Sequence, residues 1–316
     1  MVDEEYTFEV AATEAGMRLD RWLTLREPTL GRRRAKDLCD EGRVFVDGHR
    51  AFKAMPLPEG ARVSFPAPVP RHAAANPELP LDVRFENEHC VVVHKPAGQP
   101  TAPLDARENT TLANALLGHY PQMGAVGSNP LEPGLIHRLD NGTSGLLVAA
   151  KSQWAFDALK SALARGTIDK QYLAVVVDTE LPDQGRIDVA LEPSPHNPRR
   201  VIAARSRSGG AREAQTTYVV IERQLGLALV SATAKRALRH QIRAHFASIA
   251  CPLANDEAYG GPRVEALAQG RHALHARRVA WAGNGVMAGF DVVAEVPADL
   301  EIWLSHSGFR LIHSIE

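Results

Sequence analysis

The spacing of apolar residues predicts two helices and a small hairpin near the start of the chain. In residues 18–23, and again in 32–39, apolar side chains recur every three or four positions, which is the period of one helix face. Residues 43–49 then show the pattern of a strand that runs into Asp47-Gly48, a sequence that favours a two-residue hairpin turn. Helix, helix and hairpin together predict a small α/β unit over residues 16–66.

From about residue 81 onward, patterns typical of strands predominate, and helical patterns occur between them without regular order. Strands are predicted over 90–94, 170–177, 214–218 and 227–232, and helices over 110–117, from Ser152 to Gly166, and over 239–247. In the last helix, Ile242, Phe246 and Ile249 are expected on one face. This order fits an α+β fold, with a largely antiparallel or mixed sheet and flanking helices, better than a regular βαβ repeat.

A proline-rich stretch separates these two parts of the chain. Residues 67–80 are expected to form an extended linker, and residues 81–316 a second domain. A length of 316 residues agrees with two domains.

Composition narrows the classes of function. The formal net charge of −1 excludes a globally basic nucleic-acid binder, so any RNA contact must come from local clusters. The three cysteines are far apart and form no C-x-x-C pair, which disfavours a disulfide framework or a zinc site and suits a reducing compartment. The acidic start resembles no secretory signal, and no apolar run approaches bilayer length. We therefore expect a monomeric cytoplasmic protein without a membrane partner or a bound metal.

The most informative stretch is His137-Arg-Leu-Asp-Asn-Gly-Thr-Ser-Gly-Leu-Leu147. Apolar runs at 134–136 and 146–150 flank it, so two strands with a tight connection are expected to hold Asp140 at an exposed bend. Composition alone would favour a plainer interpretation, in which Asp140 is a turn residue that bonds its own backbone.

The stretch resembles the motif H-R-L-D-x-x-T-S-G-L of the pseudouridine synthases that act on large-ribosomal RNA and tRNA. The segments Lys95-Pro-Ala-Gly98 and 214–218 resemble two further motifs of that family. The resemblance implies isomerisation of uridine to pseudouridine, with Asp140 as the catalytic carboxylate. That reaction exchanges the C1′–N1 bond for a C1′–C5 bond without redox or group transfer, so no cofactor is expected. Three mechanisms stay open: Asp140 attacks the sugar, attacks the base, or removes a proton from the ribose.

The resemblance also implies the other site residues. Gln241-Ile-Arg243 matches H-Q-[IL]-R, whose arginine pairs with the catalytic aspartate. Arg243 is therefore expected to pair with Asp140, and Ile242 is expected to pack beneath the base. Tyr172, in the K-x-Y motif, is expected to stack on the flipped base or to move a proton. The plainer interpretations are a surface helix arginine and a half-buried strand tyrosine. Arg138 and Thr143 are expected to bind substrate, with Arg138 filling the space that the extruded uridine leaves.

Two segments depart from the family pattern. Residues 235–239 replace the usual G-R-[TK] before His-Gln, and Asn255-Asp256 replaces the usual G-D. These departures concern local RNA contacts and the identity of the substrate more than the pairing of Asp140.

The first unit resembles the S4 RNA-binding domain, whose second helix tends to be basic. RNA contacts are therefore expected from Arg32, Arg33 and Lys36, although a solvated helix face would carry the same charges. The basic segment 193–210, with Arg199 and Arg200, is expected to form a loop or hairpin that also binds RNA.

Two alternatives to the isomerase are open on sequence alone. One is a catalytically silent RNA-binding or ribosome-assembly factor. The other is a glycosidase-like enzyme, although glycosidases usually carry two carboxylates. Ribosomal RNA is the expected substrate, with tRNA next.

Overall fold

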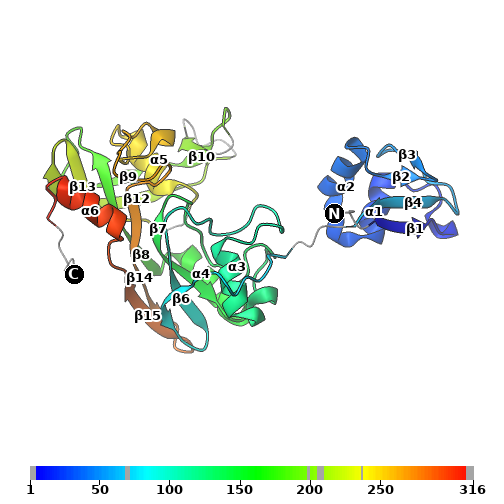
Figure 1. The fold of residues 1–316 in the computed structure, drawn as a ribbon, viewed down its shortest axis with the longest axis horizontal. Coiled ribbons are helices and arrows are strands. Elements are labelled where there is room, and N and C mark those ends of the chain that lie inside the picture. Colours follow the sequence, from blue (N-terminus) through cyan, green and yellow to red (C-terminus); the bar gives the residue numbers. More distant parts are fainter. Residues whose placement is uncertain (1–4, 68–71, 198–199, 205–209, 236–237, 311–316) are drawn as a thin grey trace. The chain divides into compact units, whose positions relative to one another are not determined.

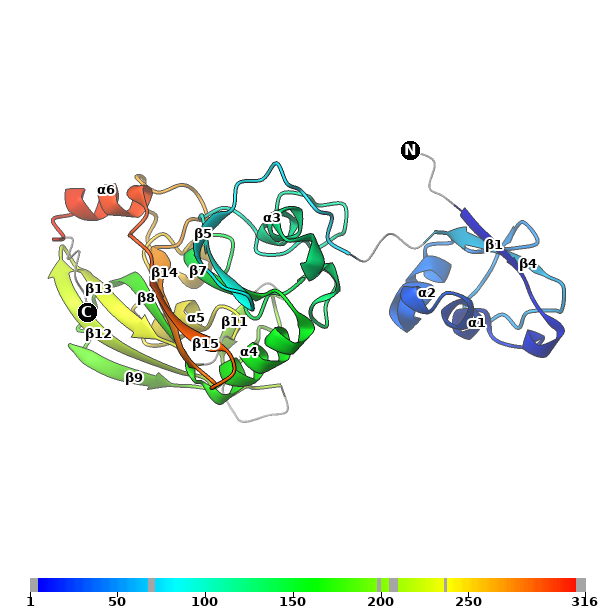
Figure 2. The same cartoon turned by 90° about the horizontal axis from the view of Figure 1, so that it is seen from below.

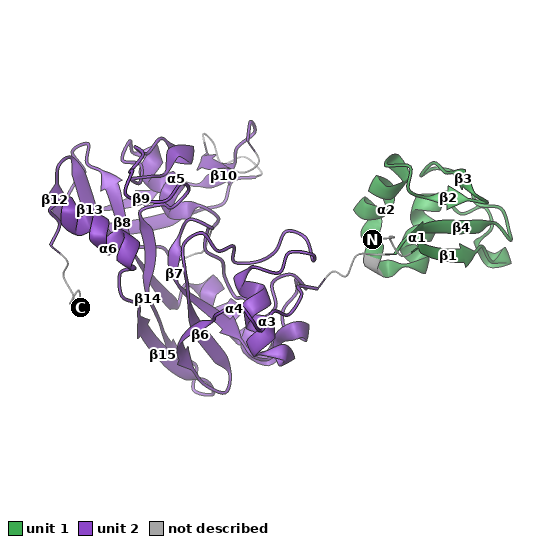
Figure 3. Ribbon diagram, in the orientation of Figure 1, with its two compact units in different colours: residues 1–71 green, residues 72–316 purple. Residues whose placement is uncertain are grey.

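The structure is a computed structural model that describes residues 5–67, 72–197, 200–204, 210–235 and 238–310. The chain divides into two compact units, residues 1–71 and 72–316 (Figure 1). Figure 2 gives a second view, and Figure 3 colours the two units separately. No helix among the described residues has the length and apolar character that a membrane span requires.

The first unit packs two helices against a small antiparallel sheet with the strand order β1-β4-β2-β3. Its elements are β1 (Glu5–Glu9), the 3-10 turn η1 (Ala12–Glu14), α1 (Leu19–Arg26), η2 (Pro28–Leu30), α2 (Gly31–Asp40), β2 (Phe45–Val46), β3 (His49–Arg50) and β4 (Arg62–Pro66). The apolar faces of both helices meet the sheet around Trp22, Leu38 and Phe65, none of which is more than 2% exposed.

The predicted hairpin is present in this unit. Asp47 and Gly48 both have positive φ, 49° and 77°, as a two-residue turn between twisted strands requires. The predicted start at residue 16 was too late, because β1 pairs along its whole length with β4. A five-residue strand with alternating exposure carries too weak a signal to be recognised without its partner.

The predicted linker was too long at its C-terminal end. Ala73 is buried in the second unit and donates its N–H to the Pro130 carbonyl at 3.0 Å. Asn76 donates its N–H to the Asn114 carbonyl at 2.9 Å. Residues 72–80 therefore pack on the second unit, because backbone groups in this proline-rich stretch find partners that the local sequence does not indicate.

The second unit is built on a mixed sheet with the strand order β5-β6-β7-β14-β8-β13-β12-β9, and β15 pairs with β14. Only β7 and β14 pair in parallel within the described residues, so the expected α+β class is confirmed. The elements are β5 (Asp82–Glu86), β6 (Cys90–Lys95), α3 (Leu112–His119), η3 (Pro121–Ala125), β7 (Ser144–Ala150), α4 (Gln153–Arg165), β8 (Ile168–Val177), β9 (Gln184–Asp188), β10 (Leu191–Pro193), β11 (Val201–Ala203), β12 (Gln215–Gln224), β13 (Leu227–Thr233), α5 (Gln241–Ser248), η4 (Glu257–Tyr259), β14 (Leu274–Gly283), β15 (Ala288–Val293) and α6 (Ala298–His306).

Helices cover both faces of this sheet. Alternate residues of β8 point to opposite faces, so Tyr172 and Ala174 join the cluster that includes α3 and α5. Leu173 and Val175 pack instead with α6. Figure 2 shows α6 on one face and α5 on the other. Central strands that are buried on both faces give the candidate site a rigid base.

Two local expectations about this unit were wrong. Residues 134–136 form no strand, because only Leu135 makes an isolated bridge, to Ala149. The chain before Asp140 is therefore a loop held by single contacts. Ile249 does not share a helix face with Phe246, because α5 ends at Ser248 and Ile249 is 36% exposed.

The basic segment 193–210 is only partly described. β10, which ends at Pro193, pairs antiparallel with β11 inside the segment, so a hairpin is present. Arg199 lies outside the described residues. Arg200 is described, and its position is given with the site.

Candidate active site

Asp140 lies in a loop immediately before β7 and faces a pocket. The loop is closed by a hydrogen bond from the Thr143 N–H to the Asp140 carbonyl at 3.0 Å. The Asp140 side chain is 22% exposed, so the expected exposed bend is in fact a largely enclosed position. The pocket is lined by Arg138, Leu139, Asp140, Thr143, Tyr172, Ala234, Leu238, His240, Gln241, Ile242, Arg243 and Leu274.

Close backbone packing fixes the turn beside Asp140. The Gly98 N–H donates to the Asn141 carbonyl at 2.7 Å, and the His272 N–H donates to the Gly142 carbonyl at 3.0 Å. A Cβ on Gly142 would lie 1.8 Å from the Gly270 carbonyl oxygen, so no other residue fits there without moving the chain. The turn is thus held from two sides.

Lys95 also holds the turn at Asn141 and Gly142. It is fully buried, and its Nζ donates to the carbonyls of Pro96 and Gln99 at 2.8 Å and to that of Asn141 at 3.3 Å. Burial, together with the charge of Arg271, lowers its pKa to about 7, and Asp140 opposes the shift. The three carbonyls satisfy all the donors of an ammonium group. Lys95 therefore ties the K-P-A-G loop to the loop of Asp140.

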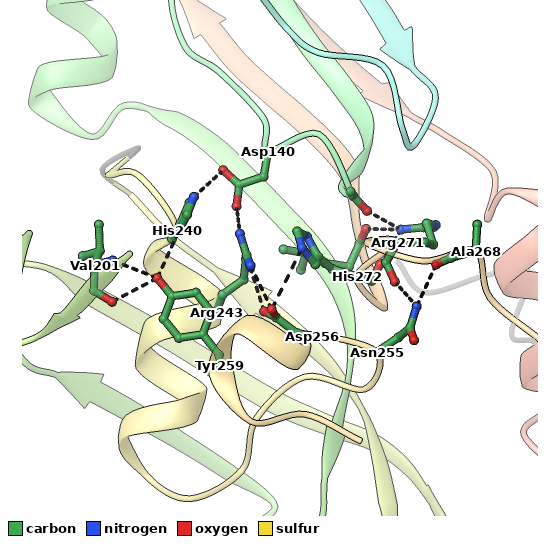
Figure 4. A network of polar contacts seen from close by, with 12 residues as sticks. Asp140, Val201, His240, Arg243, Asn255, Asp256, Tyr259, Ala268, Arg271 and His272 are labelled. Atoms are coloured by element: carbon green, nitrogen blue, oxygen red, sulfur yellow. Dashed lines mark hydrogen bonds and ion pairs between the residues drawn. The ribbon is translucent and has the colours of Figure 1, made fainter. Parts of the chain in front are cut away.

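Arg243 joins two carboxylates at the centre of the site (Figure 4). Its Nη1 lies 2.8 Å from Asp140 Oδ2. Its Nε and Nη2 donate to the two oxygens of Asp256 at 2.7 and 2.8 Å. The bidentate contact fixes the plane of the guanidinium, and Nη1 is left to face Asp140. Asp256, whose side chain is completely buried, thus orients the cation that pairs with Asp140.

The charges around Asp140 keep it ionised. Burial raises its pKa, but the charge that His240 carries at low pH, the charge of Arg243 and the hydrogen bond from Arg243 outweigh burial, so its pKa lies below the ordinary carboxyl value. Burial also lowers the pKa of His240, to about 4, so that its ring is neutral near pH 7. Arg243 is therefore the cation that maintains the carboxylate under physiological conditions.

Asn255 explains one departure from the family pattern. Its φ is +59°, a conformation in which glycine is unstrained and asparagine is among the best tolerated of the other residues. Its side-chain amide donates to the carbonyls of Ala268 and Arg271 at 3.0 and 2.7 Å, and its Oδ1 accepts from the Val264 N–H at 3.0 Å. The change from glycine thus keeps the turn before Asp256 and adds three contacts.

His240, at the N-terminus of α5, lies between Asp140 and Tyr259. Its Nε2 is 3.7 Å from Asp140 Oδ1, and its Nδ1 is 2.9 Å from the Tyr259 hydroxyl. That hydroxyl also contacts the carbonyl and the N–H of Val201, at 2.9 and 3.0 Å. The hairpin strand β11 is thereby connected to the pocket.

The remaining motif residues lie where they can contact a base in the pocket. Tyr172 and Ile242 are 8% and 5% exposed and line the pocket with Asp140. Burial and the charge of Asp140 raise the pKa of Tyr172, so the phenol stays protonated. Thr143 lines the pocket, and its buried hydroxyl has no hydrogen-bond partner among the described residues. The structure brings the predicted catalytic residues together, but their roles stay predictions.

The predicted RNA-binding residues fall in different settings. Arg32, Arg33 and Lys36 are exposed on α2, opposite its buried face. Arg138 is exposed at the pocket and pairs with Glu132 at 2.8 Å. Arg200 is half-buried, with its guanidinium 4.9 Å from the centre of the Tyr259 ring. The structure therefore shows a contact of Arg200 with the Tyr259 ring, and RNA binding by Arg200 stays a prediction.

Sequence reasoning assigned no role to Lys95, His240, Asp256 or Tyr259. Lys95, His240 and Asp256 lie inside motifs that the sequence analysis recognised. The motifs identify these residues but do not show which groups their side chains contact. Tyr259 had no signal, because its contacts depend on residues far along the chain. Within the described ranges, no group of three or more His, Cys, Asp or Glu side chains is placed to hold a metal ion.

Comparison with known proteins identifies the family. A sequence model described as RNA pseudouridylate synthase matches residues 89–248, which include Asp140, Tyr172 and Arg243. The chain therefore belongs to the RNA pseudouridylate synthase family, whose members are isomerases that act on RNA.

Relatives of similar length support this assignment. A ribosomal large subunit pseudouridine synthase D from Zymomonas mobilis is 34% identical, over 94% of this chain and 96% of the relative. A protein of the same name from Xylella fastidiosa is 33% identical, over 90% of this chain and 87% of the relative. The solved structure of human RNA pseudouridylate synthase domain containing 4 has a TM-score of 0.56 at 22% identity. It covers 73% of this chain and 94% of the human chain, and shows the shared fold.

Proposed function

We propose that this enzyme converts uridine to pseudouridine in ribosomal RNA, with Asp140 as the catalytic carboxylate. The observation that carries the proposal is the contact between Asp140 and Arg243, 2.8 Å long, at the wall of a pocket. It keeps a single carboxylate ionised beside a space lined by Tyr172 and Ile242. Those side chains suit the faces of a flipped base.

The lining of the pocket argues against simple hydrolysis of the glycosidic bond. Among the described residues that line it, Asp140 is the sole carboxylate. Asp256 is turned away and is occupied by both Nε and Nη2 of Arg243. A glycosidase would usually need a second carboxyl group facing the bond. Release of free uracil from RNA would favour that alternative over isomerisation.

The test of the catalytic role is Asp140→Asn. The amide has nearly the shape of the carboxylate but is neither a nucleophile nor a base, so pseudouridine formation should be abolished while RNA affinity stays near that of the unmodified enzyme. Product formation and RNA binding are measured on both proteins. Appreciable turnover by the variant would remove Asp140 from the central role.

The choice of ribosomal RNA rests on two observations. Two relatives that match most of the chain are named for the large ribosomal subunit. The first unit has two helices and a hairpin, with Arg32, Arg33 and Lys36 exposed on one helix, and we assign it an S4-like RNA-binding role. A ribosomal substrate would place a monomeric enzyme in the cytoplasm. Mapping of pseudouridines in total RNA, with and without the gene, identifies the modified uridine. A missing pseudouridine in tRNA alone would contradict the ribosomal assignment.

A further inference from the structure

The reaction needs a proton carrier in addition to the carboxylate. When C5 of the base bonds to C1′, C5 still carries its hydrogen, and N1 has become the nitrogen of an N1=C6 bond. The C5–H bond must then break, and its electron pair re-forms C5=C6. The N1=C6 pair returns to N1, which takes up a proton. This balance holds whether Asp140 attacks the sugar or removes a ribose proton, and it rests on the proposed function.

The pocket offers few groups for this task. Tyr172 is a poor base, since burial and Asp140 raise the pKa of its phenol. One oxygen of Asp140 is occupied by Arg243 Nη1 at 2.8 Å, and the carboxylate is already engaged in the glycosidic step. Arg138 and Arg243 are cations. Of the described residues that line the pocket, His240 is the remaining one with a titratable group.

The hydrogen bonds around Tyr259 assign the tautomer of His240. The tyrosine hydroxyl has one proton, which it donates to the Val201 carbonyl at 2.9 Å. It accepts from the Val201 N–H at 3.0 Å. Its contact with His240 Nδ1, at 2.9 Å, is then satisfied only when Nδ1 carries the hydrogen. The lone pair of the neutral ring therefore lies on Nε2, on the side of Asp140 and the pocket.

The backbone of His240 is also held in an uncommon conformation. Its φ is +54° and its ψ is 18°, in the left-handed region, at the position that precedes α5. Residues other than glycine adopt this conformation rarely, and such residues cluster at functional sites. The strained position directs the ring at the pocket, whereas Gln241 turns inward and donates to the Gln215 carbonyl.

From this geometry we propose that His240 accepts the C5 proton at Nε2 and returns it to N1. Both atoms flank C6 on one edge of the ring, so one acceptor can serve both without moving far. During the transfer the ring is an imidazolium whose Nδ1–H is bonded to Tyr259 and whose Nε2–H faces the carboxylate of Asp140 at 3.7 Å. Tyr259 is a positioning residue in this scheme, because it acts through His240.

The experiment uses His240→Asn in the full chain. Asparagine tolerates positive φ, and its amide reaches the place of Nδ1, so the contact with Tyr259 is kept while Nε2 is removed. Single-turnover rates are measured on ribosomal RNA that carries either ordinary uridine or uridine deuterated at C5. The variant should be at least about 100-fold slower, as expected for loss of a general base. Its deuterium isotope effect should exceed that of the unmodified enzyme, since C5–H cleavage becomes limiting.

Two further variants complete the test. Tyr259→Phe keeps the aromatic ring but removes the hydroxyl that holds the hydrogen of His240 on Nδ1. This variant should slow turnover by about 3- to 10-fold. His306→Asn makes the same change on the exposed face of α6 and should have no effect. The proposal is overturned if His240→Asn turns over at the normal rate. It is also overturned if the variant is slow but its deuterium isotope effect is unchanged. If the unmodified enzyme forms no pseudouridine in any RNA, the proposed function itself has failed.

Discussion

At the scale of single residues, the site depends on how one guanidinium is divided between two acids. Asp256 takes two donors of Arg243 and leaves Nη1 for Asp140. An isolated arginine side chain would have many rotamers, whereas the bidentate contact selects one. Asp256 therefore supports the negative charge of Asp140 indirectly, because it fixes the orientation of the Arg243 guanidinium.

Replacement of Arg243 tests this arrangement. Arg243→Met leaves two carboxylates without their cation, and the loss of one partner from a buried pair costs roughly 3–5 kcal/mol. In the unmodified enzyme the lowered pKa of Asp140 contributes stability above its unfolded-state pKa, and this is lost as the pH falls through the folded-state pKa. In the variant burial acts on Asp140 without that cation, so its pKa rises and activity should be lost at a higher pH as the solution is acidified. A folded-state pKa above the unfolded-state value reverses the linkage, so the stability of the variant should fall as the pH rises. Urea unfolding and a pH–rate profile measure the two effects.

Arg243→Lys is the matched control. It keeps the positive charge but cannot contact both carboxylates in the same fork geometry. Its pH–rate profile should lie between those of the other two proteins. Normal activity and an unchanged pH profile in Arg243→Met would show that the ion pair does not maintain the carboxylate.

At the scale of elements, the loops at the ends of the strands hold the reactive groups. The loop before β7 is fixed by Gly98, Gly142 and Lys95, and the loop after α5 is fixed by Asn255. No strand over residues 134–136 supports the loop of Asp140, where only Leu135 forms an isolated bridge, so these contacts hold the loop.

Gly142→Ala should disturb the loop of Asp140 directly. Its Cβ would meet the Gly270 carbonyl oxygen at 1.8 Å, and relief of such an overlap typically costs 1–3 kcal/mol. The free energy of unfolding and the turnover rate should both fall. Gly210→Ala is a suitable control, because its Cβ would have no heavy atom of the described residues within 4 Å. Equal stability of the two variants would mean that the loop adapts.

Asn255 allows backbone strain and side-chain contacts to be separated. Asn255→Gly removes three hydrogen bonds but suits the positive φ, whereas Asn255→Ala removes the same bonds and adds strain. The alanine variant should be less stable by about 1–2 kcal/mol, which is the cost of the left-handed conformation. Urea unfolding of both variants gives the difference. Equal stabilities would assign the role of Asn255 to its hydrogen bonds alone.

At the scale of the whole molecule, the two units are expected to divide binding from chemistry. Arg32, Arg33 and Lys36 are proposed to contact phosphates, and each such contact changes the slope of log K against log salt by about 0.9 for duplex nucleic acid. Conversion of all three to alanine should weaken RNA binding and flatten its salt dependence. Single-turnover rates at saturating RNA should stay near those of the unmodified enzyme, since Asp140 lies in the second unit.

A charge-preserving swap provides the control for this prediction. With Arg32→Lys, Arg33→Lys and Lys36→Arg the net charge is unchanged, so the salt dependence should be retained if phosphates alone are contacted. Normal binding by the triple alanine variant at several salt concentrations would support a solvated helix face. Normal binding with slow turnover would show that the first unit helps to assemble the active site.

Local sequence determined much of this protein. The period of apolar residues predicted α1, α2 and α4, because each is stabilised by one continuous buried face, and a continuous apolar run predicted β8, which is buried on both faces. Asp47-Gly48 predicted a hairpin turn because both residues tolerate positive φ, and Ser152 predicted the start of α4 because its hydroxyl accepts from the Ala155 N–H. Both effects are local, so the sequence alone reveals them. The motif around Asp140 identified the family before any geometry was known.

The tertiary structure alone decided what surrounds the carboxylate. Asp140 and Arg243 are 103 residues apart, and the bond between Tyr259 and Val201 spans 58 residues. Such contacts depend on the order of strands in the mixed sheet, which no short segment specifies. The tautomer of His240, the orientation of Arg243 and the burial of Lys95 follow from those contacts. A sequence can therefore name the groups of this site, but only the packed sheet fixes their distances and charges.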